Sequence, residues 1–156
     1  MLYEQLLCRP LESIDVEAAC RGWPDKEELE RHVRATQQRA DLRAVALREL
    51  QEKYVDREAL AGMLRRLAAS WSVLKKRLRE QLIPSMALRQ MLQQAGAPDR
   101  PEQIGIDVAR LRRSYLEAQQ VRRRFTVLDL ATMTGLMPDC LGHIFAARGP
   151  WGEGAG

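Results

Sequence analysis

The longest periodic stretch of the sequence runs from Asp56 to Leu82, and it constrains the fold more than any other feature. Its apolar residues recur at steps of four and three, which places them along one narrow face of a helix. These residues are Leu60, Leu64, Leu67, Trp71, Leu74, Leu78 and Leu82. Pro84 ends the pattern, because proline lacks an amide donor and disfavours helical geometry in the residue before it. We interpret the stretch as a long helix that packs against other helices.

The rest of the chain repeats the helical pattern in shorter segments. No segment alternates apolar and polar residues in the manner of a strand for long. We therefore predict an all-α, multi-helix domain of about eight helices that spans residues 1–148. The glycine-rich end, 149–156, is expected to be a flexible tail.

Composition narrows the classes of protein that the chain can belong to. The 156 residues are 46% hydrophobic and 29% charged, with a formal net charge of +4, which is ordinary for a globular domain. No run of about 18 apolar residues occurs, so we expect no membrane span. Cys8, Cys20 and Cys140 form an odd and widely spaced set. Such a set fits reduced cysteines better than a disulfide framework, and we expect a cytoplasmic location.

A basic run followed by an almost uncharged segment stands near the C-terminal end. Arg122, Arg123 and Arg124 precede Thr126 and Asp129, which have the spacing of a helix N-cap and its acidic partner three residues on. The following residues are apolar nearly all round, and Gly135 stands where a glycine ends a helix. We predict a short buried helix beneath three arginines.

Arg122 is also expected to lie near the apolar face of the helix that precedes it. Asp107 has the position of an N-cap for a helix that we expect to run to about Arg124. Because Arg122 follows Tyr115 by seven residues, it falls almost on the apolar stripe of that helix. An arginine there must extend its charge to solvent, pair with an acidic side chain or meet an anionic ligand. The sequence leaves these three alternatives open.

Recognised catalytic and metal-binding motifs are absent. His32 and His143 are the only histidines, and no zinc-protease, paired-cysteine or phosphate-loop motif occurs. Cys140 and His143 are one helical turn apart, but a metal would need two further ligands, and nothing marks Cys140 as an activated thiol. We assign no catalytic residue and no metal ligand within this chain.

A helix-turn-helix-like DNA-binding regulator using residues 126–147 is the alternative function. The glycine turn and the apolar spacing agree with that motif. However, the second helix would present Asp139, Gly142 and His143 outward, which gives few donors for base edges and places an acidic group near phosphates. Nucleic acid is therefore the disfavoured partner.

Three segments carry a resemblance to a known family. Arg123 to Ala131, followed by Thr134 to Leu136, resembles the C-terminal end of bacterial sn-glycerol-1-phosphate dehydrogenases. Gly96 to Pro98 and Pro101 to Asp107 resemble the stretch that precedes it in that family. Leu2 to Leu7 resembles the helix just after the family's metal-binding HGE segment. Together the three segments extend the resemblance over essentially the whole predicted domain.

The resemblance implies a fold and a reaction. The family belongs to the iron-containing alcohol dehydrogenase and dehydroquinate synthase-like group, with a nucleotide-binding α/β domain and a helical C-terminal domain. Substrate, NAD(P) and a divalent metal, zinc or nickel, meet between the domains. The complete enzymes interconvert dihydroxyacetone phosphate and sn-glycerol 1-phosphate with NAD(P)H in phospholipid metabolism.

This sequence departs from the family pattern in one respect. It begins after the region of the family's metal ligands and lacks the nucleotide-binding domain, so the resemblance implies a truncated oxidoreductase. We expect it to bind no cofactor alone, to be inactive alone, and to have the missing domain as its partner; a homodimer is left open. Arg122, Arg123 and Arg124 are the candidate residues for a substrate phosphate.

Overall fold

The predicted long helix is present as α5 (Arg57–Gln81) in the computed structural model, which describes residues 1–152. Asp56 begins it by accepting the Ala59 amide at 2.8 Å, which satisfies one of the free donors at a helix N-terminus. Leu60, Leu64 and Trp71 are buried on one face, as the periodicity predicted.

Helices make up all the regular structure of the described residues, so the all-α prediction is confirmed. The elements before α5 are α1 (Leu2–Leu7), the 3-10 turn η1 (Leu11–Ser13), α2 (Val16–Arg21), α3 (Lys26–Thr36) and α4 (Ala40–Lys53). Those after it are α6 (Ser85–Gln94), the 3-10 turn η2 (Pro101–Ile104), α7 (Val108–Gln120), α8 (Val127–Met133) and α9 (Met137–Ile144).

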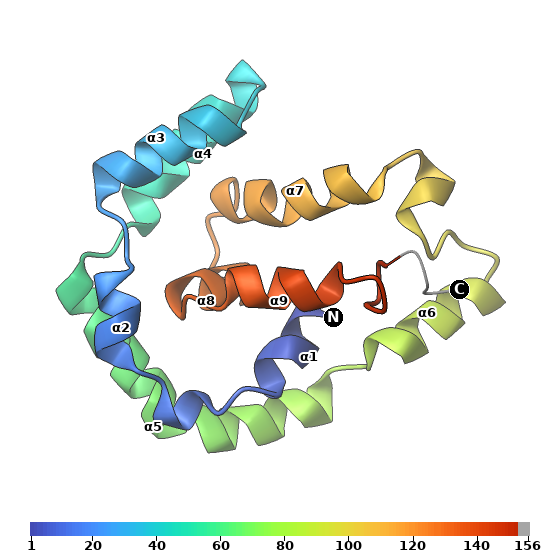
Figure 1. Ribbon diagram of the computed structural model, residues 1–156, viewed down its shortest axis with the longest axis horizontal. Coiled ribbons are helices and arrows are strands. Elements are labelled where there is room, and N and C mark those ends of the chain that lie inside the picture. Colours follow the sequence, from blue (N-terminus) through green and yellow to red (C-terminus); the bar gives the residue numbers. More distant parts are fainter. Residues whose placement is uncertain (153–156) are drawn as a thin grey trace.

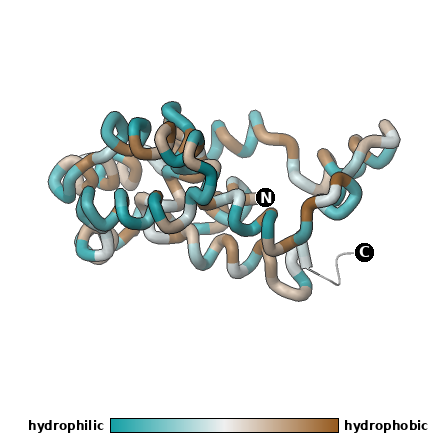
Figure 2. Tube along the Cα trace, turned by 90° about the horizontal axis from the view of Figure 1, so that it is seen from above, coloured by the Kyte–Doolittle hydropathy of each residue, from teal (hydrophilic) through white to brown (hydrophobic). Residues whose placement is uncertain are grey.

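The helices form an open curve around a central group. Figure 1 shows α2 to α7 arranged as an arc, with α1, α8 and α9 inside it. Apolar and polar residues alternate along most helices (Figure 2), as expected for helices with one buried and one exposed face. The two ends of the sequence therefore pack together at the centre, while the middle of the chain surrounds them.

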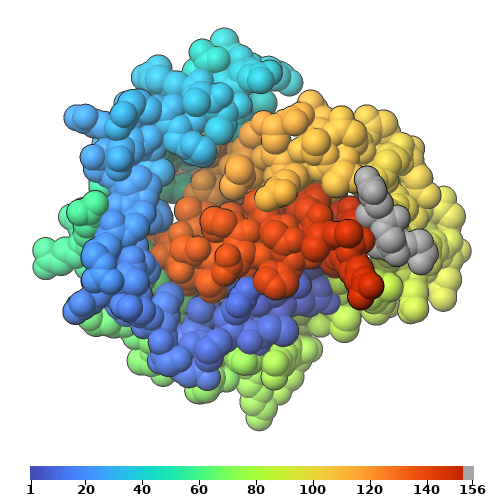
Figure 3. Space-filling model, viewed as in Figure 1, coloured from blue at the N-terminus to red at the C-terminus, as the bar shows by residue number. Residues whose placement is uncertain are grey.

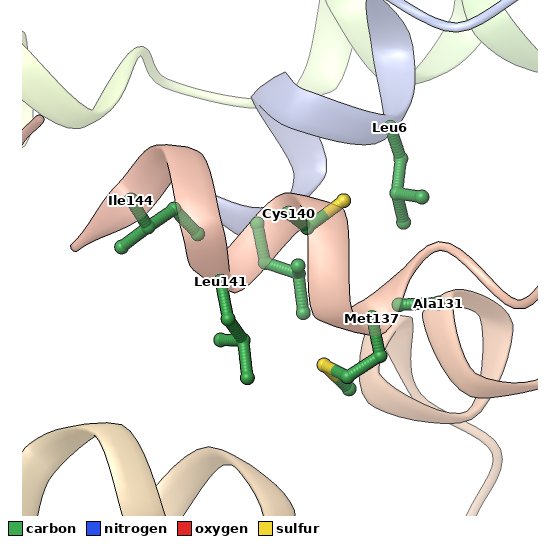
Figure 4. Packing of buried hydrophobic residues seen from close by; sticks show 7 residues of the cluster. Leu6, Ala131, Met137, Cys140, Leu141 and Ile144 are labelled. Carbon is green, nitrogen blue, oxygen red and sulfur yellow. The ribbon is translucent and has the colours of Figure 1, made fainter. Parts of the chain in front are cut away.

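The central core joins α1 to α8 and α9. Leu6, Ala131, Cys140 and Ile144 are fully buried there, and Met137 and Leu141 are nearly so (Figure 4). The predicted short buried helix is thus confirmed as α8, with Ala131 and Met133 inside. In a second cluster, Trp71 of α5 packs against Leu7 of α1 and Leu11 of η1.

Ser85 is the first residue of α6 and follows Pro84, which occupies the N-cap position. The Ser85 hydroxyl and amide donate to the two carboxylate oxygens of Glu4, at 2.7 and 2.8 Å. These bonds fix the start of α6 to α1.

The end of the chain returns to the core. Residues 149–152 of the expected tail form a turn in which the Trp151 amide donates to the Ile144 carbonyl at 3.1 Å. Residues 153–156 lie outside the described part of the chain. Within the described part, no helix has both the length and the apolar character needed to cross a membrane.

Candidate functional site

The N-terminus of α8 is built by the capping pair that the sequence predicted. The Leu128 amide donates to the Thr126 hydroxyl at 3.2 Å, and the Thr126 amide donates to Asp129 Oδ2 at 2.7 Å. These bonds satisfy donors that a helix leaves free at its start. At the other end, Gly135 has φ of +72°, the left-handed conformation that ends a helix at glycine.

Asp129 has a second role that the sequence did not reveal. Lys53, the last residue of α4, places its Nζ 2.7 Å from Asp129 Oδ1. The two side chains are only 18% and 4% exposed, so the ion pair is largely removed from water. Gln119 also donates to Asp129 Oδ1, at 2.9 Å. The carboxylate therefore joins α4, α7 and α8.

The same lysine binds backbone carbonyls at the end of α7 and in the loop after it. Lys53 Nζ donates to the backbone carbonyls of Gln119 (3.0 Å) and Arg122 (2.7 Å). A lysine that takes the last carbonyls of a helix replaces the bonds that further helical residues would have made. α7 accordingly ends at Gln120, four residues before the expected Arg124.

The placement predicted for Arg122 was consequently wrong. Because α7 has already ended, Arg122 does not fall on the apolar stripe, and its side chain is exposed in the loop between α7 and α8. Within residues 1–152, its side chain has no hydrogen-bonding or ionic partner. Only its carbonyl is used, by Lys53.

The three predicted phosphate-binding arginines lie together on this loop, and we call residues 122–124 the arginine loop. All three are exposed. Arg123 lies 3.8 Å from the Glu52 carboxylate, with the two side chains 75% and 58% exposed, which makes a weak surface pair. The loop therefore presents positive charge to solvent.

A cavity opens beside the arginine loop. It has a volume of about 210 Å³ and lies between α3, α4, α7 and α8, with Met63 of α5 also in its wall. Figure 3 shows the recess between the blue-to-cyan α3 and α4 and the orange α7 and α8. Arg123 and Phe125 line it, and Phe125 is 60% exposed, so the arginine loop forms part of its mouth.

Buried amides tie the helices around this cavity together. Gln120 Oε1 accepts from Gln37 Nε2 at 2.9 Å and from the Thr36 hydroxyl at 3.0 Å. Gln37 also donates to the Glu117 carbonyl at 3.2 Å. Gln37 and Gln120 are 3% and 9% exposed, so their hydrogen bonds join the end of α3 to α7 in a water-poor setting.

The chain matches no family model, no curated protein and no solved structure. Its function is therefore inferred from the geometry of the site and from the residues that carry the resemblance.

The side chains considered for metal or thiol chemistry differ in burial: Cys140 is buried, whereas His32 and His143 are exposed. Cys140 is fully buried in the central core, and burial raises the pKa of its thiol. His143 is exposed, and its Nδ1 lies 2.8 Å from the Asp139 carbonyl. His32 is exposed at the cavity, on another helix. Across residues 1–152, no group of three or more His, Cys, Asp or Glu is placed to hold a metal.

The α8–α9 pair has the arrangement of a helix-turn-helix, but one face of its second helix is buried in the central core. Met137, Cys140, Leu141 and Ile144 of α9 are buried. The exposed positions of α9 include Asp139, Gly142 and His143, as the sequence indicated. This face gives few groups that can donate hydrogen bonds to bases.

Sequence reasoning missed the residues that position the site. Lys53, Gln37 and Gln120 were not singled out, because each acts through a partner far away in the chain. No signal in the sequence marked Gln120 either, because it follows Tyr115 by five residues and so falls away from the expected inward stripe of α7. Nothing distinguishes Lys53 from an ordinary lysine at a helix end.

Proposed function

We propose that the chain is the helical domain of an oxidoreductase resembling sn-glycerol-1-phosphate dehydrogenases. In the complete enzyme, NAD(P)H and a divalent metal act on dihydroxyacetone phosphate, and this domain supplies one wall of the site. The observation that carries the proposal is the run from Arg123 to Leu136, with the resembling segments before it in the same order.

One feature of the chain supports a role as one part of a larger enzyme. Met86, Leu88, Met91 and Leu92 of α6 are 42–57% exposed, an unusual concentration of apolar side chains on one surface helix. Such exposed apolar side chains fit packing against a second domain. In the family that the chain resembles, the hydride donor and the metal are held by parts that residues 1–156 do not include, so we expect no hydride transfer by these residues alone.

The arginine loop is the proposed substrate-phosphate contact. Arg122 and Arg124 are exposed and have no salt-bridge partner within residues 1–152, so their guanidinium groups are free to bind an anion. A phosphate held there would be bound equally in the ground and transition states, and this binding would act mainly on KM. The free cysteines fit a reducing cytoplasm, where we place the enzyme.

The test uses a chimera in which a characterised dehydrogenase of this family keeps its nucleotide domain and metal ligands, and residues 1–148 replace its remaining helical part. Arg122→Ala should raise the KM for dihydroxyacetone phosphate about tenfold or more, as expected when one charged hydrogen bond is lost. Arg113→Ala, an exposed arginine on α7, is the matched control and should leave KM unchanged. Equal effects of the two variants would refute the phosphate role.

A further inference from the structure

We propose that the cavity beside the arginine loop binds an amphiphilic anion, with an apolar body inside the cavity and a carboxylate or phosphate headgroup at Arg123. This ligand goes beyond the dehydrogenase proposal, since it requires neither nucleotide nor metal. Three properties of the cavity lead to this ligand: its size and walls, the state of its polar groups, and the charge at its mouth.

The walls are predominantly apolar. Leu29 of α3, Leu50 of α4, Met133 of α8 and Val55 are among the lining residues. A dry cavity of about 150 Å³ with walls of this kind already accepts benzene-sized molecules. The 210 Å³ found here therefore accommodates a body of several carbon atoms.

The buried polar groups of the wall are already hydrogen-bonded. Lys53 donates to three acceptors, namely Asp129 and the carbonyls of Gln119 and Arg122. Asp129 accepts from Lys53, from Gln119, and from both the amide and the hydroxyl of Thr126. A polar ligand in the interior would have to break these bonds, at a cost of about 1–3 kcal/mol for each buried group left unsatisfied. The part of the ligand that lies inside is therefore apolar.

Positive charge is in excess at the mouth. Of the Lys, Arg, Asp and Glu residues that line the cavity, Lys53 and Arg123 are cationic and Asp129 is anionic. Because Lys53 and Asp129 neutralise each other, Arg123 remains, and Glu52 at 3.8 Å is beyond hydrogen-bonding distance. Arg122 and Arg124 add two exposed cations on the same loop. A ligand whose apolar body is inside thus meets cations where its other end leaves the cavity.

Phe125 and Leu116 complete the entrance. They line the cavity while being 60% and 37% exposed, so each has one surface on the cavity and one on solvent. An apolar body that enters between them covers part of this exposed surface, which stabilises the complex by about 25 cal/mol for each Å² removed from water. The exposed aromatic ring next to three arginines is thereby accounted for.

Isothermal titration calorimetry of the full chain tests the proposal with ligands of one chain length. Decanoate, decyl phosphate, decanol and decyltrimethylammonium are titrated below their micelle-forming concentrations. We expect one molecule of decanoate or decyl phosphate to bind. Decyltrimethylammonium should bind at least about tenfold more weakly, because a cationic headgroup cannot accept the charge-assisted hydrogen bond from Arg123. Comparison of the two anions shows which headgroup is preferred.

Two variants place the ligand. Leu116→Trp fills the entrance from a partly exposed position and should weaken decanoate binding about tenfold. Arg123→Gln should weaken decanoate binding and leave decanol binding unchanged. Leu92→Gln on the exposed face of α6 and Arg113→Ala are the controls and should change neither. Circular dichroism melting of each variant verifies that it is folded.

Three results would overturn the proposal. The first is no binding of either anion to the folded chain. The second is equal affinity for the anionic and cationic ligands, which would show that Arg123 recognises nothing. The third is insensitivity to Leu116→Trp together with loss of binding in Leu92→Gln, which would place the ligand on α6. Failure of the chimeric dehydrogenase leaves these measurements unaffected.

Discussion

Asp129 accepts hydrogen bonds from three residues while it is 3% exposed, and one of them, Lys53, is the charge that balances it. Removing one partner of a buried pair leaves the other charge without compensation in a poorly solvated setting. Loss of the Asp129 carboxylate should therefore destabilise the region around α8 by leaving Lys53 without its counter-charge.

We predict that Asp129→Ala lowers the free energy of unfolding by about 3 kcal/mol or more. The measurement is urea denaturation followed by circular dichroism. Glu17→Ala is the control: its pair with Arg21 has a contact of 3.8 Å between side chains that are 88% and 70% exposed. That change should cost less than about 1 kcal/mol. Equal losses in the two variants would contradict a buried role for the Lys53–Asp129 pair.

Glu4 gives a prediction about pH at the same scale. Partial burial raises the pKa of its carboxyl. Hydrogen bonds from the Ser85 hydroxyl and amide, together with the Met1 amino group, lower the pKa by more than burial raises it. The net pKa lies below the ordinary value. A carboxyl with a lowered folded-state pKa stabilises the fold above its unfolded pKa, and that contribution is lost as pH falls through the folded value.

The check is an NMR titration of the Glu4 side chain in the wild type and in Ser85→Ala. The variant removes the hydroxyl donor, so the pKa of Glu4 should rise towards the ordinary value, and the acid-side loss of stability should become smaller and be complete at a higher pH. An unchanged Glu4 pKa in Ser85→Ala would show that the 2.7 Å hydroxyl contact does not stabilise the ionised form.

At the scale of elements, Gly135 makes the turn between α8 and α9. Gly135 has φ of +72°, where a side chain is strained by roughly 1 kcal/mol even though no atom lies within 4 Å of the position that an added methyl group would take. Gly135→Ala should therefore lower the free energy of unfolding by about 1 kcal/mol, measured by the same denaturation experiment.

Gly142 is the matched control for that substitution. It lies within α9, is exposed, and has nothing within 4 Å of an added Cβ. Gly142→Ala should raise stability by roughly 0.5–1 kcal/mol, because alanine has the higher helix propensity. Losses of the same size at both positions would mean that backbone conformation does not decide the outcome.

Local signals predicted most of the elements and part of the site. Leucine spacing predicted α5, and the Thr126–Asp129 spacing with Gly135 predicted both ends of α8. The end of α7 was predicted wrongly because it depends on Lys53, a residue of another helix. The bonds between Ser85 and Glu4 also join residues far apart in the sequence, in α6 and α1. The sequence thus predicts what neighbouring residues decide, and misses what distant partners decide.

At the scale of the whole molecule, the chain brings its two ends together inside an arc of helices (Figure 1). This arrangement leaves the arginine loop and the cavity mouth on the surface, and it leaves the apolar face of α6 exposed. In the proposed enzyme, the first of these surfaces serves the substrate and the last serves the second domain. The two surfaces can be altered independently, because they lie on different elements.

Hydride transfer by the chimera is the most direct test of the proposed function. NADH or NADPH oxidation is measured with dihydroxyacetone phosphate for the chimera and for the isolated chain, each confirmed to be folded. We expect turnover by the chimera and none by residues 1–156 alone. A folded chimera that retains its metal and nucleotide but does not turn over, or an isolated chain that does, would contradict the proposed function.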